Sequence, residues 1–168
     1  MTRYVALLRA VNVAGTGKLR MTTLRSICVD AGFHRIETYI ASGNVVFDSV
    51  DDPATVRTKL QRRLHTCSGR PIGVFVRTGA ELRAVLRANP YRDRDPGRSY
   101  VLFLNEELPE DCAAGAVHRS DELIEAAGRE IYVHYPSGMG RSKLRIPTAG
   151  SATARNMNTV AKLVAMSS

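Results

Sequence analysis

The side chains best suited to chemistry in this 168-residue sequence are gathered in residues 139–168. This segment contains five Lys or Arg residues and no Asp or Glu, together with several Ser, Thr and Asn side chains. Cations beside hydroxyl and amide donors suit an anion, because charge-assisted hydrogen bonds to phosphate and carboxylate are the strong ones. The segment therefore predicts a site for an anion, but it does not specify a reaction.

The C-terminal polar stretch is expected to open a helix over residues 154–165, since Met157 and Val160 begin an apolar stripe. Arg155 and Asn156 would then lie in the first turn, where free N–H groups and the helix dipole favour an anion. Arg155 itself is unfavourable beside that dipole, so we expect it to pair either with a ligand anion or with an acidic side chain of the chain. The acidic candidates are Glu106, Glu107 and Asp111.

The neighbouring stretch Gly140–Leu144 adds Ser142 and Lys143, which could serve the same anion. Lysine presents a compact charge that suits phosphate. A Ser–Lys catalytic dyad is compatible with the composition, but no third element supports it. Asn158 falls on the polar side of the expected helix and completes the C-terminal set of candidates.

Near the N-terminus, Arg9 and Asn12 follow an apolar run and lead into a Gly-rich loop that ends at Lys18. A Walker phosphate loop would need Gly at position 12 and a hydroxyl at position 19, where the sequence has Asn12 and Leu19. This difference argues against an NTPase. The loop is either a flexible connector or an informal anion contact through its amides and Lys18.

A third polar cluster, Ser42-Gly43-Asn44, joins two expected strands. It reflects either backbone geometry, since Gly and Asn tolerate positive φ, or a polar loop at the mouth of a cleft. Ser42 lacks a nucleophile elbow and no His–Asp pair can be assigned, so the catalytic residues and the question of enzyme activity stay open. The four His and three Cys lack metal-ligand spacing, so we predict no metal site, and no cofactor is specified.

The candidate ligand-binding residues share a cationic, hydroxyl or amide side chain, and we expect them to line a cleft between two units of the chain. Arg and Lys would hold a small phosphate- or carboxylate-bearing ligand, and Ser and Asn would orient it. These residues are Arg9, Asn12, Lys18, Ser42, Asn44, Ser142, Lys143, Arg155, Asn156 and Asn158.

The net charge of +8 is unevenly distributed along the chain. Residues 1–90 carry a balance of +8, residues 91–138 a balance of −5 and residues 139–168 a balance of +5. Basic ends that share one face would attract phosphate, nucleic acid or an acidic partner. The excess of 20 Arg over 4 Lys could equally reflect the base composition of the genome.

Two alternative functions follow from these features. One is sequence-independent nucleic-acid binding, although the expected third strand offers only Phe47 instead of the stacking signature of an RNA-recognition module. The other is a non-catalytic interaction protein that dimerises through an exposed strand edge. No apolar run approaches the roughly 20 residues of a membrane span, and Val5–Leu8 is followed at once by Arg9, so we expect no membrane contact and a cytoplasmic location.

The hydrophobic pattern of the first 90 residues predicts the element order βαββαβ. The expected elements are strand 4–9, a helix ending at Asp30, strand 36–40, strand 45–47, a helix from Pro53 to the break at Gly69, and strand 72–77. The later expected elements are helix 81–88, strand 100–104, helix 109–116, strands 122–126 and 130–135, and the final helix.

The polar, proline-containing loop at residues 91–98 is the expected domain boundary. The predicted fold class is α+β, with two ferredoxin-like units of the βαββαβ type. The first unit would span residues 1–90. The second would span residues 91–168 and be incomplete or end in a helix in place of its last strand.

Four separated stretches of the sequence resemble, in the same order, the domain-of-unknown-function family 1697 (DUF1697), a group of small bacterial cytoplasmic proteins. The stretches are Tyr4–Asn12, Thr38–Phe47, Gly140–Leu144 and Thr153–Thr159. The resemblance covers essentially the whole chain and implies an α+β fold of ferredoxin-like units, but it implies no activity. The sequence departs from the family pattern at Ala10 and Ala14, where Gly is expected, and at Met157, where Trp is expected.

Overall fold

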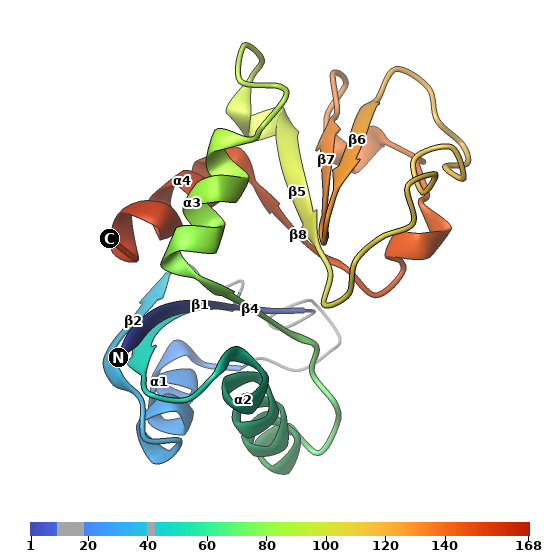
Figure 1. Ribbon diagram of the computed structural model, residues 1–168. Coiled ribbons are helices and arrows are strands. Elements are labelled where there is room, and N and C mark those ends of the chain that lie inside the picture. The colour runs from blue at the N-terminus through green and yellow to red at the C-terminus, as the bar shows by residue number, and fades with distance from the viewer. Residues whose placement is uncertain (10–18, 40–42) are drawn as a thin grey trace. The chain divides into compact units, whose positions relative to one another are not determined.

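The computed structural model describes residues 1–9, 19–39 and 43–168, and these form two compact units. The first unit comprises Met1–Arg83 and Leu163–Ser168, and the second comprises Ala84–Lys162. Each unit contains one four-stranded antiparallel sheet (Figure 1). The mixed α+β class expected from the sequence is therefore confirmed.

The first unit follows the expected order βαββαβ. Its elements are β1 (Thr2–Leu8), α1 (Met21–Asp30), β2 (His34–Tyr39), β3 (Asn44–Ser49), α2 (Pro53–Ser68) and β4 (Val74–Thr78). The strands lie in the order β2-β3-β1-β4, and every neighbouring pair is antiparallel.

The core of the first unit lies between the sheet and the two helices α1 and α2, which cover one of its faces (Figure 1). Alternate residues of β1, among them Tyr4 and Ala6, join this core because successive side chains of a strand point to opposite faces. The rings of Phe33 and Phe47 stack with their centroids 4.2 Å apart. Burial of each such large apolar side chain stabilises the unit by about 1.5–3 kcal/mol.

Local signals in the sequence define both ends of α2. Asp52 accepts a hydrogen bond of 2.7 Å from the Thr55 N–H, and Pro53 occupies the first turn, where its missing N–H costs nothing. Gly69 ends the helix with φ of 75°, a left-handed conformation in which glycine needs no strain. The expected helix over this segment is confirmed.

The second unit contains four strands, and its sheet repeats the strand arrangement of the first. The elements are η1 (Pro96–Arg98), β5 (Ser99–Phe103), β6 (Leu123–Ala127), β7 (Glu130–His134), η2 (Met139–Arg141), η3 (Pro147–Ala149) and β8 (Thr153–Asn156). The order β6-β7-β5-β8 places the second, third, first and fourth strands of the unit side by side, as in the first sheet.

Two expectations for the second unit are wrong. Pro109–Ala116 forms successive turns with N–H bonds to the third preceding carbonyl, because so short a stretch gains little from helix propagation and Gly115 lowers the helix propensity of its end. Thr153–Asn156 is a strand instead of the start of the last helix, because its backbone pairs with the edge of β5. The second sheet is therefore complete.

Each sheet ends in a strand that passes directly into a helix, α3 (Gly79–Arg87) after β4 and α4 (Met157–Met166) after β8. Thr78 and Glu81 cap α3 reciprocally, with each side chain accepting the other residue's backbone N–H. At the start of α4, Asn156 Oδ1 accepts from the Thr159 N–H at 2.9 Å.

No helix in the described part of the chain is long and apolar enough to cross a membrane.

Cys28 and Cys112 are buried, and burial raises the pKa of the Cys28 thiol to about 12. Cys67, at the end of α2, is exposed.

Candidate functional site

A pocket of about 330 Å³ lies within the second unit, and it contains two of the predicted site residues, Ser142 and Lys143. Three segments of the chain form it. They contribute His118, Ser120, Asp121 and Glu122, then Tyr135, Ser137 and Gly138, and finally Arg141, Ser142 and Lys143. A pocket of this size is at the lower end of the range for small-molecule sites.

Backbone pairing brings these segments together. Gly138 has φ of 90° and donates its N–H to the Tyr135 carbonyl, so the chain turns sharply at the end of β7. Val117 and Arg145 form an isolated antiparallel bridge with hydrogen bonds of 2.8 and 3.0 Å. This bridge holds residues 118–122 beside residues 141–143.

Glu122 forms a buried polar anchor of the pocket. Its Oε2 accepts a bond of 2.6 Å from the Ser120 N–H, and its Oε1 accepts a bond of 2.8 Å from the Ser142 hydroxyl. The backbone hydrogen bond from Ser120 is the main reason that the pKa of Glu122 is lowered. The carboxylate therefore stays ionised and tethers Ser142.

The same contact assigns Ser142 a positioning role. Its proton is donated to Glu122, while its oxygen accepts the Leu144 N–H at 3.1 Å. In a Ser–Lys dyad the lysine would take that proton, whereas here the proton is directed to Glu122, whose lowered pKa makes it a weak base. The hydroxyl fixes the course of the chain through the pocket.

Two exposed cationic side chains, Arg141 and Lys143, line the pocket. Neither side chain forms a hydrogen bond or an ion pair with any residue that the structure describes. The neighbouring carboxylates are engaged by hydroxyls, since Ser137 donates to Asp121 Oδ2 at 2.8 Å and Ser142 donates to Glu122. The two cations are therefore available to an anion.

His118 also lines the pocket and has a left-handed backbone with φ of 55°. Histidine is among the few residues that are enriched in this region of backbone space. Burial raises the pKa of Tyr135, on the opposite segment, to about 12, so its phenol is neutral.

The other C-terminal candidates lie on β8 and α4 and do not line this pocket. Arg155 is buried in the strand, where Nη1 donates to Thr153 Oγ1 at 2.8 Å and to the Ala154 carbonyl at 2.9 Å. Burial lowers the pKa of Arg155 to about 10. The expected place of Arg155 and Asn156 in a first helical turn is wrong, because both precede α4, and Asn158 is exposed on that helix.

In the first unit, Arg9 and Asn44 lie near the same end of the sheet. The Arg9 N–H donates to the Gly73 carbonyl at 2.9 Å, and the Leu8 N–H donates to Gly43 at 2.9 Å, next to Asn44. Asn44 is buried and donates from Nδ2 to the Tyr39 carbonyl at 2.9 Å. The remaining candidates Asn12, Lys18 and Ser42 lie outside the described residues.

Sequence reasoning did not select several residues of the pocket, namely His118, Ser120, Asp121, Glu122, Ser137 and Arg141. The available local signal was the Ser137-Gly138 turn that follows a clear strand. The segment 118–122 carries no comparable signal, because only its pairing with residue 145 brings it to the site.

A solved protein structure shares the fold of this chain. A solved structure titled "The structure of conserved bacterial protein SP0830 from Streptococcus pneumoniae" is similar, with a TM-score of 0.83 and 28% sequence identity. The similarity covers 99% of this chain and 98% of that one. No curated protein matches the sequence.

The model of one protein family matches residues 1–132, which is most of the chain. Its description is "Protein of unknown function (DUF1697)". The segment 141–143 of the pocket lies beyond the matched residues, whereas the similarity to the streptococcal structure extends over it. By this match the chain belongs to the DUF1697 family, as its sequence motifs predicted.

Proposed function

We propose that this protein binds a small anionic ligand, bearing phosphate or carboxylate, in the pocket of its second unit. One observation supports the proposal most directly. Arg141 and Lys143 line a pocket of about 330 Å³, and neither side chain forms a hydrogen bond or an ion pair with a described residue. Unpaired cations at a concave site favour an anion, which would gain charge-assisted hydrogen bonds there.

The two cations suit different parts of an anion. The planar guanidinium of Arg141 can donate two parallel hydrogen bonds to a carboxylate or phosphate, whereas Lys143 supplies a compact charge. Ser120 lines the same pocket and adds a hydroxyl group that can donate to the ligand, whereas the Ser137 hydroxyl donates to Asp121. Glu122 keeps the segment 141–143 in place through Ser142.

The shared strand order of the two sheets supports assigning both units to the ferredoxin-like class, and we propose this classification. Arg9, which is exposed near the end of the first sheet where Asn44 is buried, is a separate candidate for ligand contact. Arg9→Ala tests that contact independently of the pocket.

The pocket is tested by thermal unfolding with added ligands, using Lys143→Ala and Arg141→Ala. The matched controls are Lys162→Ala and Arg92→Ala, which remove exposed cations of the same unit that do not line the pocket. The panel contains inorganic phosphate, a sugar phosphate, a nucleotide, a dicarboxylate and a short oligonucleotide, each at low and physiological salt.

We expect at least one small anion to raise the unfolding midpoint of the wild type and both controls, and to lose this effect in the two pocket variants. A shift that all four variants retain would place the ligand elsewhere. A shift with the oligonucleotide alone, lost at physiological salt, would indicate generic phosphate attraction and contradict the proposal.

A further inference from the structure

We infer that the ligand of this pocket carries a cationic group, such as an ammonium, in addition to its anionic group, and that Asp121 binds the cationic group. The inference deepens the proposed function and rests on it. Its basis is the arrangement of charges around the pocket, where two carboxylates and two cations occur together.

One carboxylate oxygen of Asp121 can accept a hydrogen bond from a ligand. Its Oδ2 accepts a bond of 2.8 Å from the Ser137 hydroxyl, which fixes the orientation of the group. Its Oδ1 accepts no hydrogen bond from the described residues, and no described Lys, Arg or His pairs with it. The side chain is exposed, so a ligand can reach it.

The other carboxylate of the pocket has a different role. Glu122 is 3% exposed, and each of its two oxygens accepts a hydrogen bond from the chain. A buried carboxylate whose two oxygens both accept hydrogen bonds from the protein is poorly placed to accept another from a ligand. Asp121 is therefore the acidic residue through which the pocket can recognise a cation.

Opposite charges share this pocket without pairing with each other. Arg141 and Lys143 form no ion pair with Asp121, although all three line the same space of about 330 Å³. A purely anionic ligand would meet the cations but also the repulsive field of Asp121. A ligand with charges of both signs satisfies the cations and Asp121 together, as in an amino acid or an aminoalkyl phosphate.

Calorimetric titration of the full chain with matched probe pairs tests the inference. The pairs differ only by an ammonium group: glycine with acetate, β-alanine with propionate, 4-aminobutyrate with butyrate, and phosphoethanolamine with ethyl phosphate. The three amino acids vary the spacing between the charges. The variants are Asp121→Asn, which can still accept from Ser137, and Asp93→Asn, a control at an exposed acid of the same unit that does not line the pocket.

We expect the amine of at least one pair to bind about tenfold more tightly than its partner, the size of effect that one charge-assisted hydrogen bond gives. Asp121→Asn should reduce that ratio to below about twofold, and it should bind the purely anionic probe at least as tightly as the wild type does, because the repelling carboxylate is gone. Asp93→Asn should keep the full ratio.

The outcomes separate the two proposals. Anionic probes that bind through Lys143 with no gain from the ammonium would overturn this inference and leave the proposed function intact. A gain that survives Asp121→Asn would also overturn it. If no probe of either kind binds, both the inference and the proposed function fail.

Discussion

The hydroxyl of Ser142 donates a hydrogen bond of 2.8 Å to Oε1 of Glu122, a residue 20 positions earlier in the chain. This contact joins two of the three segments that form the pocket. It directs the Ser142 proton to Glu122, so Ser142 and Lys143 are not arranged as the Ser-Lys dyad that their sequence suggests.

Replacing Ser142 by Ala should weaken this tether. We expect the midpoint of thermal unfolding to fall by about 2–4 °C, because Glu122 loses one hydrogen bond and the Leu144 N–H loses its acceptor. Anion binding should weaken in parallel as the segment 141–143 loosens. Differential scanning fluorimetry, with Ser151→Ala as an exposed control, measures the effect, and an unchanged midpoint would contradict the positioning role.

Buried His134 should make stability depend on pH. Its Nδ1 lies 2.8 Å from the hydroxyl of Ser99, which itself donates to the Asp95 carbonyl, so the ring nitrogen is the donor. Burial lowers the pKa of His134, because desolvation disfavours the charged ring. The positive charges of Arg94 and Arg98 lower this pKa further, whereas the negative charges of Asp95 and Asp121 raise it.

The sign follows from proton binding in the two states. Below about pH 6.5 the unfolded chain binds a proton at this residue more readily than the folded protein, so stability falls as pH decreases toward the lowered folded pKa. Urea unfolding between pH 7.5 and pH 5 measures this loss. His134→Asn, which can still donate to Ser99, should flatten the dependence, whereas the exposed control His65→Asn should leave it steep.

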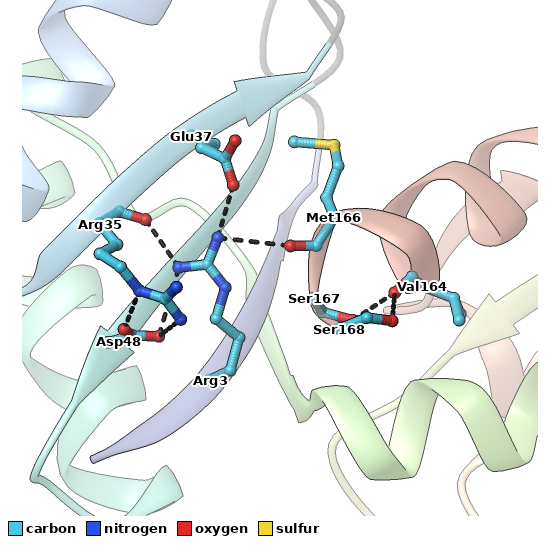
Figure 2. A network of polar contacts seen from close by, with 8 residues as sticks. All are labelled: Arg3, Arg35, Glu37, Asp48, Val164, Met166, Ser167 and Ser168. Atoms are coloured by element: carbon cyan, nitrogen blue, oxygen red, sulfur yellow. Dashed lines mark hydrogen bonds and ion pairs between the residues drawn. The ribbon is translucent and has the colours of Figure 1, made fainter.

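The side chain of Arg3 connects the first strand, the neighbouring edge of the sheet and the C-terminus of the chain (Figure 2). It donates to the Arg35 carbonyl at 2.7 Å, to Asp48 at 3.2 Å, to Glu37 at 2.5 Å and to the Met166 carbonyl at 3.3 Å. Arg35 also binds Asp48, which lowers the pKa of that carboxyl.

Removing the Arg3 guanidinium by Arg3→Ala should lower the free energy of unfolding by about 2–3 kcal/mol, because the carboxylates of Asp48 and Glu37 lose their hydrogen bonds to it. Arg3→Lys should recover only part of the loss, since an ammonium cannot reproduce the planar fork. Chemical denaturation measures both, with the exposed Arg25→Ala as the control. If Arg3→Lys were as stable as the wild type, a positive charge at position 3 would be enough for stability, and the planar geometry of the guanidinium would not matter.

Gly79, the first residue of α3, leaves no space for a side chain. An added Cβ would lie 2.9 Å from the Ser167 carbonyl oxygen, a backbone atom that cannot rotate away. Gly79→Ala should therefore destabilise the protein by about 1–3 kcal/mol. Gly140→Ala, where nothing lies within 4 Å of the added Cβ, should be nearly neutral in the same denaturant titration.

Elements whose signals are local can be predicted from the order of the amino acids alone. Asp52 and Pro53 start α2, Gly69 ends it, and alternating apolar residues mark the strands of the first sheet. The family predicted from the sequence motifs is also correct, and the two N-terminal motifs lie within the matched residues 1–132. Caps, turns and periodicity act over a few residues, so they can be read without knowing the rest of the fold.

The strand at Thr153–Asn156 and the set of residues that line the pocket depend on contacts between distant parts of the chain. The strand exists because β5 presents an edge some fifty residues earlier (Tyr100 opposite Asn156), and that pairing outweighs the helical pattern of the following residues. The pocket exists because Val117 pairs with Arg145 and thereby brings Asp121 and Lys143 to one place. Contacts between residues distant in sequence leave no periodic signal, and they decided which polar side chains face a common space.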